Sequence, residues 1–282
     1  MEEQNLNILE RIHNAYYSLT AAERKVADFV LAQYTQVQFM SITQLAEECG
    51  TAEATVSRFC RSLKLKGFNA FKIELARHSV TGTTISQEHP ADTQAGRAAE
   101  VGRLASDAIR QTLELTDPGK ILQAVEHLEQ ASSVMCLGAG GSMIMANECA
   151  HMFSTVTGKF YAISDSHMQM SATATMPQDA IILLFSYSGA TTSGIQVLEL
   201  AKERGIKTIL VTRFHKSPAA KLADVVLRCG SNEGPFQFGS APARIAQLIV
   251  IDLLFQEYCH RNPAQCEENI QRIAAALSGK HV

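Results

Sequence analysis

The chain has 282 residues, of which 46% are hydrophobic and 19% charged, and its formal net charge at pH 7 is −3. This length fits two ordinary domains or one large one, and the composition is typical of a soluble globular protein. The small net charge excludes a global bias toward nucleic acids or membranes, so any basic surface has to be local.

Targeting signals, disulfides and metal sites are not indicated. Residues 1–14 are polar and acidic, unlike a signal peptide, and apolar runs such as 180–185 and 248–255 are too short to span a bilayer. The seven cysteines form no CxxC pair, and the nine histidines lack metal-ligand spacing. We therefore expect a cytoplasmic protein with free thiols, no metal and no other cofactor.

The first 80 residues are predicted to be helical. Apolar residues recur at helical spacing from Leu6 to Tyr16, and a second amphipathic helix begins where Thr20 and Glu23 form a capping box. The stretch 79–95 has few large apolar residues and is rich in Ser, Thr and Gln, as linkers are. We therefore divide the chain into an all-α module over 1–80, a linker over 81–96 and an α/β domain over 97–282.

Residues 42–61 carry a helix-turn-helix pattern, in which two short helices each bury a few apolar positions. Ala46 is small where the helices would cross, and Gly50 stands at the turn, where a positive φ is needed. Ser41 is placed to cap the first helix and Thr51 to cap the second.

The second of these helices is expected to present polar and basic side chains outward, as a recognition helix in the major groove of DNA requires. Residues 58–77 contain six lysines and arginines against one glutamate, a charge distribution that fits contact with phosphates. The candidate DNA-binding residues are Thr51, Glu53, Thr55, Ser57, Arg58, Arg61, Lys64 and Lys66. A helical hairpin with a solvated basic face is the alternative interpretation.

From about residue 97 onward the pattern changes from helical to alternating. Short apolar runs predict strands at 133–137, 160–163, 180–185, 208–211 and 225–227. Helical patterns occur at 97–116, 119–131, 142–155, 166–175, 192–204, 217–222, 241–260 and 263–278. Such alternation predicts an α/β fold, a doubly wound parallel sheet with helices on both faces.

Two loops rich in glycine and hydroxyl side chains follow the first and third predicted strands. One runs from Gly138 to Ser142 and the other from Ser186 to Thr191. Open parallel sheets bind ligands at the carboxyl ends of their strands, where free N–H groups of helix N-termini attract anions. The two loops therefore predict a phosphate-monoester site built without lysine or arginine. The first loop alone also suits a tight turn, and its spacing is not that of a dinucleotide fingerprint.

The motif S-x-S-G-x-T at 186–191, with G-x-G-x-S at 138–142, resembles the sugar isomerase (SIS) domain. Preceded by this helix-turn-helix, nearly the whole chain resembles the RpiR-type bacterial transcriptional regulators, including segments 23–31, 55–72 and 243–254. The resemblance implies that an SIS domain binds a phosphorylated sugar and thereby alters the affinity of the N-terminal module for operators near sugar-catabolism genes. The expected function is a repressor that binds double-stranded DNA.

The resemblance also implies a set of ligand-binding residues. They are Gly140, Gly141, Ser142, Ser186, Ser188, Gly189, Thr191 and Glu233. SIS proteins often have an acidic residue two places after the motif threonine, and this chain departs from that pattern with Ser193. The departure removes one candidate carboxylate from the site.

A phosphosugar aldose–ketose isomerase with an N-terminal helical appendage is the alternative function. Isomerisation needs a general base near C1 and C2 of the sugar. Glu148, His151, His167 and Glu233 are the candidates. Solvation, packing or capping explains the first three without catalysis, and Glu233 could contact ligand hydroxyls without catalysing a reaction. The basic recognition helix favours the regulator, for which we expect no catalytic residue.

We expect the regulator to be a homodimer or homotetramer. Two helix-turn-helix modules would then read a palindromic operator with half-sites about 34 Å apart or a multiple of that distance. The apolar residues of 241–260 offer more apolar surface than one core needs, which favours association through the α/β domain.

Overall fold

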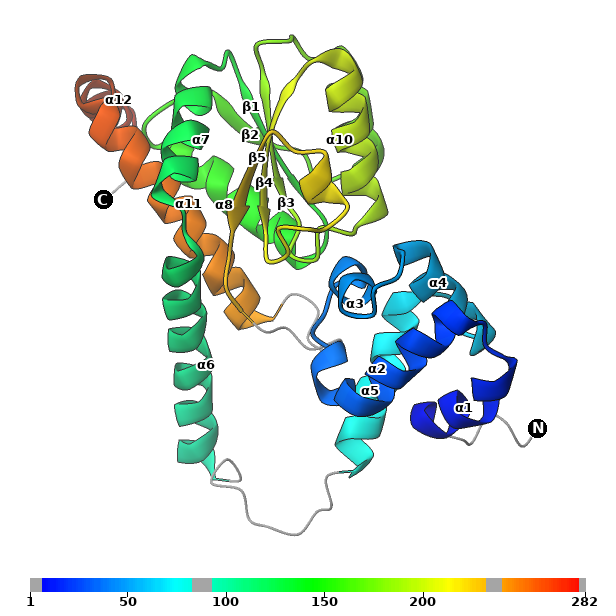
Figure 1. Ribbon diagram of the computed structural model, residues 1–282. Coiled ribbons are helices and arrows are strands. Elements are labelled where there is room, and N and C mark those ends of the chain that lie inside the picture. Colours follow the sequence, from blue (N-terminus) through cyan, green and yellow to red (C-terminus); the bar gives the residue numbers. More distant parts are fainter. Residues whose placement is uncertain (1–6, 83–92, 232–239, 279–282) are drawn as a thin grey trace. The chain divides into compact units, whose positions relative to one another are not determined.

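The computed structural model of the chain describes residues 7–82, 93–231 and 240–278 (Figure 1). The chain forms two compact units: the described residues up to Val101 belong to the first, and those from Gly102 onward to the second. Within the described ranges, no helix combines the length and apolar character that crossing a membrane requires.

The first unit is all-helical. Its helices are α1 (Ile8–Ala15), η2 (Tyr16–Ser18, a 3-10 turn), α2 (Ala21–Val37), α3 (Ile42–Glu48), α4 (Glu53–Ser62) and α5 (Phe68–Gly82). Capping boxes start α2 at Thr20 and α3 at Ser41, as predicted, and Gly50 adopts a φ of 57° in the turn before α4. Phe59 and Phe71 pack edge to face in the core, with ring centroids 5.5 Å apart.

Glu23 joins the start of α2 to the end of α4. Its carboxylate accepts hydrogen bonds from the Thr20 backbone and hydroxyl at 2.9 and 2.6 Å, and from the Ser62 hydroxyl at 2.9 Å. The side chain is buried, which alone would raise its pKa, but these hydrogen bonds and the nearby Arg58 lower the pKa below its ordinary value. The charged form is therefore the one that stabilises the fold.

Replacing Glu23 with glutamine is expected to destabilise the first unit by roughly 1–2 kcal/mol at pH 7, since a charge-assisted set of hydrogen bonds is lost. A lowered folded-state pKa contributes stability above the unfolded-state pKa, about 4.3, and that contribution disappears as the pH falls through the folded value. The difference from the wild type should therefore shrink below about pH 4 in calorimetric unfolding of the full chain. Glu48→Gln, at an exposed position, serves as the control and should show neither effect.

The second unit contains a five-stranded, all-parallel sheet with the order β2-β1-β3-β4-β5. The strands are β1 (Val134–Gly138), β2 (Phe160–Ala162), β3 (Ile181–Phe185), β4 (Lys207–Thr212) and β5 (Val225–Arg228). The helices are α6 (Gln94–Leu115, which begins in the first unit), α7 (Pro118–Gln130), α8 (Gly141–Ser154), α9 (Ser166–Thr175), α10 (Thr192–Arg204), η4 (Ala219–Lys221), α11 (Ala241–Arg261) and α12 (Pro263–Leu277).

Helices cover both faces of this sheet, so the predicted doubly wound fold is confirmed. One face packs against α7, α8 and α11, and the other against α9 and α10. All five residues of β1 and of β3 are buried, because these strands lie inside the sheet with helices on either side. The helix predicted at 217–222 is shorter than expected, a single 3-10 turn.

The strand order reverses between β1 and β3. The connection through α8 leads outward to β2, and the chain then returns past β1 to β3. Gly138 at the end of β1 pairs with Phe185 at the end of β3, so the loops that follow them begin at adjacent positions. Crevices at such a reversal are where open α/β sheets bind their ligands.

Candidate functional site

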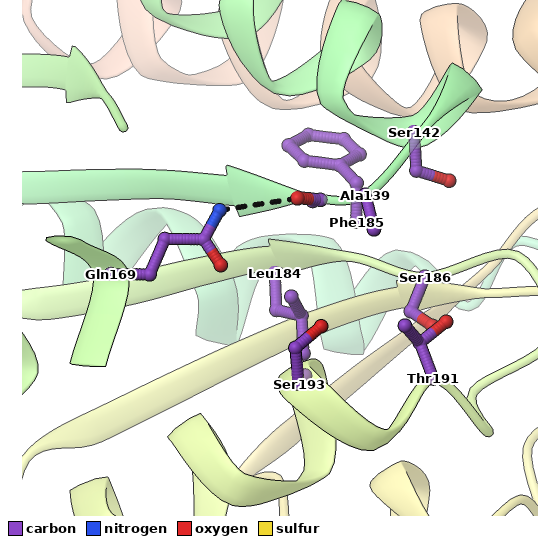
Figure 2. Close-up of a pocket in the computed structure, with 10 residues that line it drawn as sticks. Ala139, Ser142, Gln169, Leu184, Phe185, Ser186, Thr191 and Ser193 are labelled. Atoms are coloured by element: carbon purple, nitrogen blue, oxygen red, sulfur yellow. Dashed lines mark hydrogen bonds between the residues drawn. The ribbon is translucent and has the colours of Figure 1, made fainter. Parts of the chain in front are cut away.

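A small pocket opens where the two predicted loops begin (Figure 2). Its lining residues come from the ends of β1 and β3 and from the first turns of α8, α9 and α10. They are Gly138, Ala139, Ser142, Gln169, Leu184, Phe185, Ser186, Thr191, Ser193 and Gly194. The cavity has a volume of about 20 Å³, room for a water-sized group and not for a whole sugar.

Two helices start at this pocket without a side-chain cap. The N-cap of α8 is Gly140, and that of α10 is Thr191, whose hydroxyl makes no capping hydrogen bond. Side chains cap α1, α2, α3, α7, α9 and α11, whereas α4 and α12 also start without such a cap. At the start of α8 the Ser142 and Met143 N–H groups already donate to the Ala139 and Gly140 carbonyls at 3.1 and 3.0 Å. The positive dipole ends of α8 and α10 are therefore the main feature that these two helix starts offer to an anion.

The Ser186 hydroxyl is the polar group of the pocket that points most directly to a bound ligand. The residue is 5% exposed, and its Oγ is buried without any hydrogen-bond partner. A buried hydroxyl with no partner costs about 1–3 kcal/mol, which folded proteins seldom tolerate. Figure 2 shows Ser186 beside Thr191, on the wall across from Ser142. An incoming acceptor atom would satisfy this hydroxyl.

The structure brings together three of the residues predicted to bind the ligand, namely Ser142, Ser186 and Thr191. Ser188 does not line the pocket, because its Oγ turns back to accept the Ala190 N–H at 3.3 Å. The predicted residues Gly140, Gly141 and Gly189 belong to the loops but not to the pocket lining. Glu233 lies outside the described residues.

Gly189, predicted to bind the ligand, also has a structural reason to be glycine. Its φ is 59°, in the left-handed region, and a Cβ there would collide with the side chain of Ser217. The close approach that demands glycine is therefore between this loop and the segment after β4.

Sequence reasoning missed two glutamines that support the pocket. The Gln169 amide, 3% exposed, donates to the Gly138 and Ile163 carbonyls at 3.2 and 2.8 Å. The Gln247 amide on α11 donates to Ser142 Oγ at 3.1 Å. Gln247 could have been suspected, since it interrupts a long apolar stretch, whereas Gln169 carries no such signal.

Positive charge lies beside the second loop and not in the pocket itself. The Arg213 backbone N–H donates to the Tyr187 carbonyl at 3.1 Å, and the Arg213 Nε donates to the Ser231 carbonyl at 3.0 Å. Burial lowers the pKa of Arg228, at the end of β5, and the neighbouring Arg213 lowers it further. A larger cavity of about 230 Å³, beside β5, is lined by none of the predicted residues.

In the helix-turn-helix, the exposed residues of α4 are Ala54, Arg58, Arg61 and Ser62, and Ser57 is half-buried beside them. Thr55 was expected to face outward, and this was wrong: it is 5% exposed, and its Oγ accepts a hydrogen bond from Arg58 at 3.0 Å. Positions 55, 56, 59 and 60 form the inward stripe, since their spacing puts them on one side of the helix.

Two further predictions for this motif need correction. Thr51 does not cap α4, because Ala52 is the N-cap and the Thr51 hydroxyl turns to the Ala46 carbonyl. Glu53 does not point freely outward, because its carboxylate accepts from the Thr43 hydroxyl at 2.8 Å. Lys64 and Lys66 follow α4 and are exposed.

Comparison with known proteins decides the family. Residues 6–81 match the model of the helix-turn-helix domain of the rpiR family, and residues 127–256 match that of the SIS domain. A protein of Caldanaerobacter subterraneus, described as an uncharacterized HTH-type transcriptional regulator, is 32% identical over 88% of this chain and 89% of its own length. The chain belongs to the RpiR family of transcriptional regulators.

Other members of the family match over almost the full length. The HTH-type transcriptional regulator HexR of Pseudomonas aeruginosa is 30% identical over 96% of this chain and 95% of its own. The solved structure of Vibrio vulnificus NanR, complexed with ManNAc-6P, has a TM-score of 0.88 at 26% identity, covering 98% of this chain and all of that one. These relatives confirm the predicted combination of a helix-turn-helix with an SIS domain.

The chain is therefore a transcriptional regulator, as these relatives are. Among the described residues that line the pocket there is no carboxylate or imidazole. Glu148 is half-buried on α8, and His151 and His167 are exposed, each away from the lining. In the ranges that the structure describes, no cluster of histidine, cysteine or acidic residues could hold a metal ion.

Proposed function

We propose that this RpiR regulator binds operator DNA through the exposed face of α4 and senses a phosphorylated sugar at the pocket between β1 and β3. The observation that carries the ligand assignment is the unpartnered Ser186 Oγ between two helix N-termini that no side chain caps. Hydroxyl and backbone donors around a dipole end are the chemistry that a phosphate monoester needs.

The cavity is too small to enclose the whole ligand. A volume of about 20 Å³ has room for a water-sized group such as one phosphate oxygen, so the rest of the phosphate and the sugar would lie at the opening between the two loops. Of the predicted ligand residues, Ser142, Ser186 and Thr191 would contact the phosphate. The backbone of Gly140 and Gly141 would contribute N–H groups, and Glu233 stays a candidate for the sugar hydroxyls. NanR, a relative solved with ManNAc-6P, supports a phosphosugar as the class of effector.

DNA binding would follow the arrangement of α4. Ser57, Arg58 and Arg61 would face the major groove, and Lys64 and Lys66 would contact phosphates. Thr51, Glu53 and Thr55 would act mainly by fixing α4 against its neighbours. We propose repression of sugar-catabolism genes as the outcome of operator binding.

We also propose a homodimer or homotetramer in the cytoplasm. Large apolar side chains are exposed on α6 and α7: Val101 at 66%, Leu113 at 53% and Leu122 at 40%. Burying such side chains between copies would remove them from water and pair two helix-turn-helix modules. Sedimentation of the full chain gives the oligomeric state directly.

The test of the function combines two measurements on the full-length protein. Thermal unfolding is followed with a panel of hexose, N-acetylhexosamine, pentose and sugar-acid phosphates, each paired with its unphosphorylated sugar. At least one phosphate should raise the melting temperature while its sugar does not, because binding to the folded state stabilises it. The same compound should also change the affinity of the protein for its operator, a DNA sequence identified by selecting from a random pool those sequences that the protein binds. A panel that shifts neither quantity would contradict the proposal.

A further inference from the structure

The chain passes out of the second unit at two places, N-terminal to Gly102 on α6 and after Ser231 beyond β5. Inside the unit, the residue next to the second exit is hydrogen-bonded to α6. The Gly230 N–H donates to the Thr112 hydroxyl at 2.9 Å, and that hydroxyl donates to the Ala108 carbonyl at 2.7 Å. Thr112 is fully buried.

The backbone at Gly230 lies directly against α6. A Cβ added to Gly230 would come 2.5 Å from the carbonyl carbon of Gln111, so no other residue fits there without displacing the helix. A movement of the segment after β5 must therefore move α6 as well, since close-packed backbone does not yield independently.

The same segment is also attached to the second loop of the pocket. The Ser231 carbonyl accepts the Tyr187 hydroxyl at 2.6 Å and the Arg213 Nε at 3.0 Å. Tyr187 stands between Ser186 and Ser188, and its own carbonyl accepts the Thr212 hydroxyl at 3.1 Å. The Tyr187 side chain thus connects the pocket loop, in which Tyr187 follows Ser186, to the segment that contacts α6.

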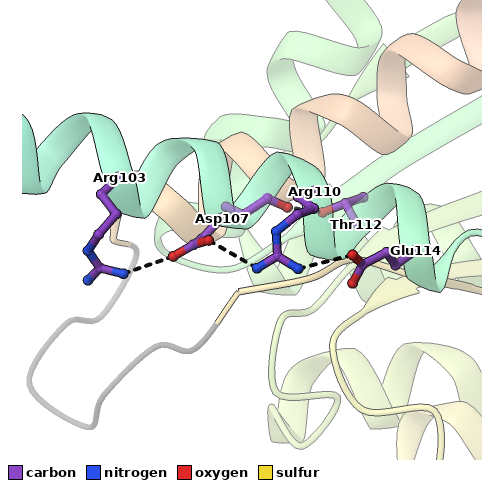
Figure 3. A network of polar contacts seen from close by, with 6 residues as sticks. Arg103, Asp107, Arg110, Thr112 and Glu114 are labelled. Carbon is purple, nitrogen blue, oxygen red and sulfur yellow. Dashed lines mark hydrogen bonds and ion pairs between the residues drawn. The ribbon is translucent and has the colours of Figure 1, made fainter.

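The far side of α6 carries a ladder of ion pairs (Figure 3). Asp107 pairs with Arg103 at 2.8 Å and with Arg110 at 3.0 Å, and Arg110 pairs with Glu114 at 3.0 Å. Hydrogen bonds to Asp107 and Glu114 raise the pKa of Arg110 above its ordinary value. Pairs at this spacing favour the helical conformation, so a displacement at Thr112 is passed along α6 and not absorbed by local unwinding.

We propose that Tyr187, Ser231, Gly230 and Thr112 form a relay that couples the phosphosugar pocket to α6. The inference rests on the proposed function of that pocket. Anion binding at Ser186 and the start of α10 would reposition the second loop, and the Tyr187 hydroxyl would carry this change to Ser231 and on to α6. Such coupling requires that the ligand binds more tightly when α6 is in one position than when it is in the other. Ligand binding then shifts the position of α6, and the position of α6 changes the ligand affinity by the same free energy.

The test is hydrogen–deuterium exchange of the full-length protein with and without each hexose, N-acetylhexosamine, pentose and sugar-acid phosphate of the thermal-unfolding panel. In the wild type, an effective phosphosugar should slow exchange in peptides covering 186–195 and alter it in peptides covering 103–115. In Tyr187→Phe and in Thr112→Val the slower exchange at 186–195 should remain, and the change at 103–115 should be lost. Thr112→Ser keeps the hydroxyl, so this variant should show the change at 103–115 as the wild type does.

Thr116→Val is the matched control. The Thr116 hydroxyl bonds to the Thr112 carbonyl at 2.8 Å, in the same helical arrangement but without contact to Gly230, so this variant should respond like the wild type. If Tyr187→Phe and Thr112→Val still transmit the response to 103–115, the relay is wrong while the pocket stands. If no phosphosugar protects 186–195 in the wild type, the pocket assignment itself fails and the relay with it. If Thr112→Val does not fold, the response of Tyr187→Phe at 103–115 alone tests the relay.

Discussion

Replacing both Arg58 and Arg61 with alanine should weaken operator binding by about 100-fold or more, because each lost DNA contact of this kind costs roughly 1–3 kcal/mol. Both side chains are exposed on the outward face of α4, the helix that follows the Gly50 turn. If the arginines contact phosphates, the slope of log affinity against log salt should also fall by about one per contact. Fluorescence anisotropy with labelled operator over a range of salt concentrations measures both quantities.

The Arg58 and Arg61 double variant should lose DNA binding without losing phosphosugar binding. The thermal shift produced by a phosphosugar should be unchanged in the double variant, since the pocket lies wholly in the second unit. Arg272→Ala, at an exposed arginine of α12 that pairs with Glu268, is the control and should leave operator binding intact. Loss of both DNA binding and phosphosugar binding in the double variant would contradict the modular picture.

Ser186→Ala is expected to have opposite effects on stability and on ligand binding. Without ligand the variant should be more stable by roughly 1 kcal/mol, because a buried hydroxyl with no partner is removed. Phosphosugar affinity should fall by about 1–3 kcal/mol, since that hydroxyl would donate to the charged phosphate. Thermal unfolding and calorimetric titration measure the two effects separately.

Two other serines make this result interpretable. Ser41→Ala removes a capping hydroxyl in the first unit and should lower stability by about 1 kcal/mol with unchanged phosphosugar affinity. Ser188→Ala should weaken binding less than Ser186→Ala, because the Ser188 Oγ already accepts the Ala190 N–H. Equal stability of wild type and Ser186→Ala, together with equal affinity, would place the anion elsewhere.

Much of the fold could be predicted from local patterns. The apolar runs located all five strands to within a residue or two, and the Thr20 and Ser41 capping boxes located two helix starts. These features depend on residues a few positions apart, whose interactions are the same wherever the segment packs. The short motifs of the two loops and of the helix-turn-helix likewise sufficed to indicate the family.

The orientation of individual side chains could not be predicted in this way. Ser186 and Ser188 are equivalent in the motif, yet one hydroxyl is left without a partner at the pocket and the other is used inside the loop. Thr55 looked like a recognition residue until the packing of α4 turned it inward. Such choices depend on which neighbouring element occupies each direction, and a single segment does not contain that information.

By itself, then, the sequence determined an N-terminal helix-turn-helix, a parallel sheet and two loops rich in glycine and hydroxyl side chains at the carboxyl ends of its strands. Only the tertiary structure decided how those loops are completed and connected. Gln247 reaches Ser142 across 105 positions of the chain, and Thr112 meets Gly230 across 118. Contacts over such separations arise from the packing of whole helices on the sheet, so no pattern within a few residues encodes them.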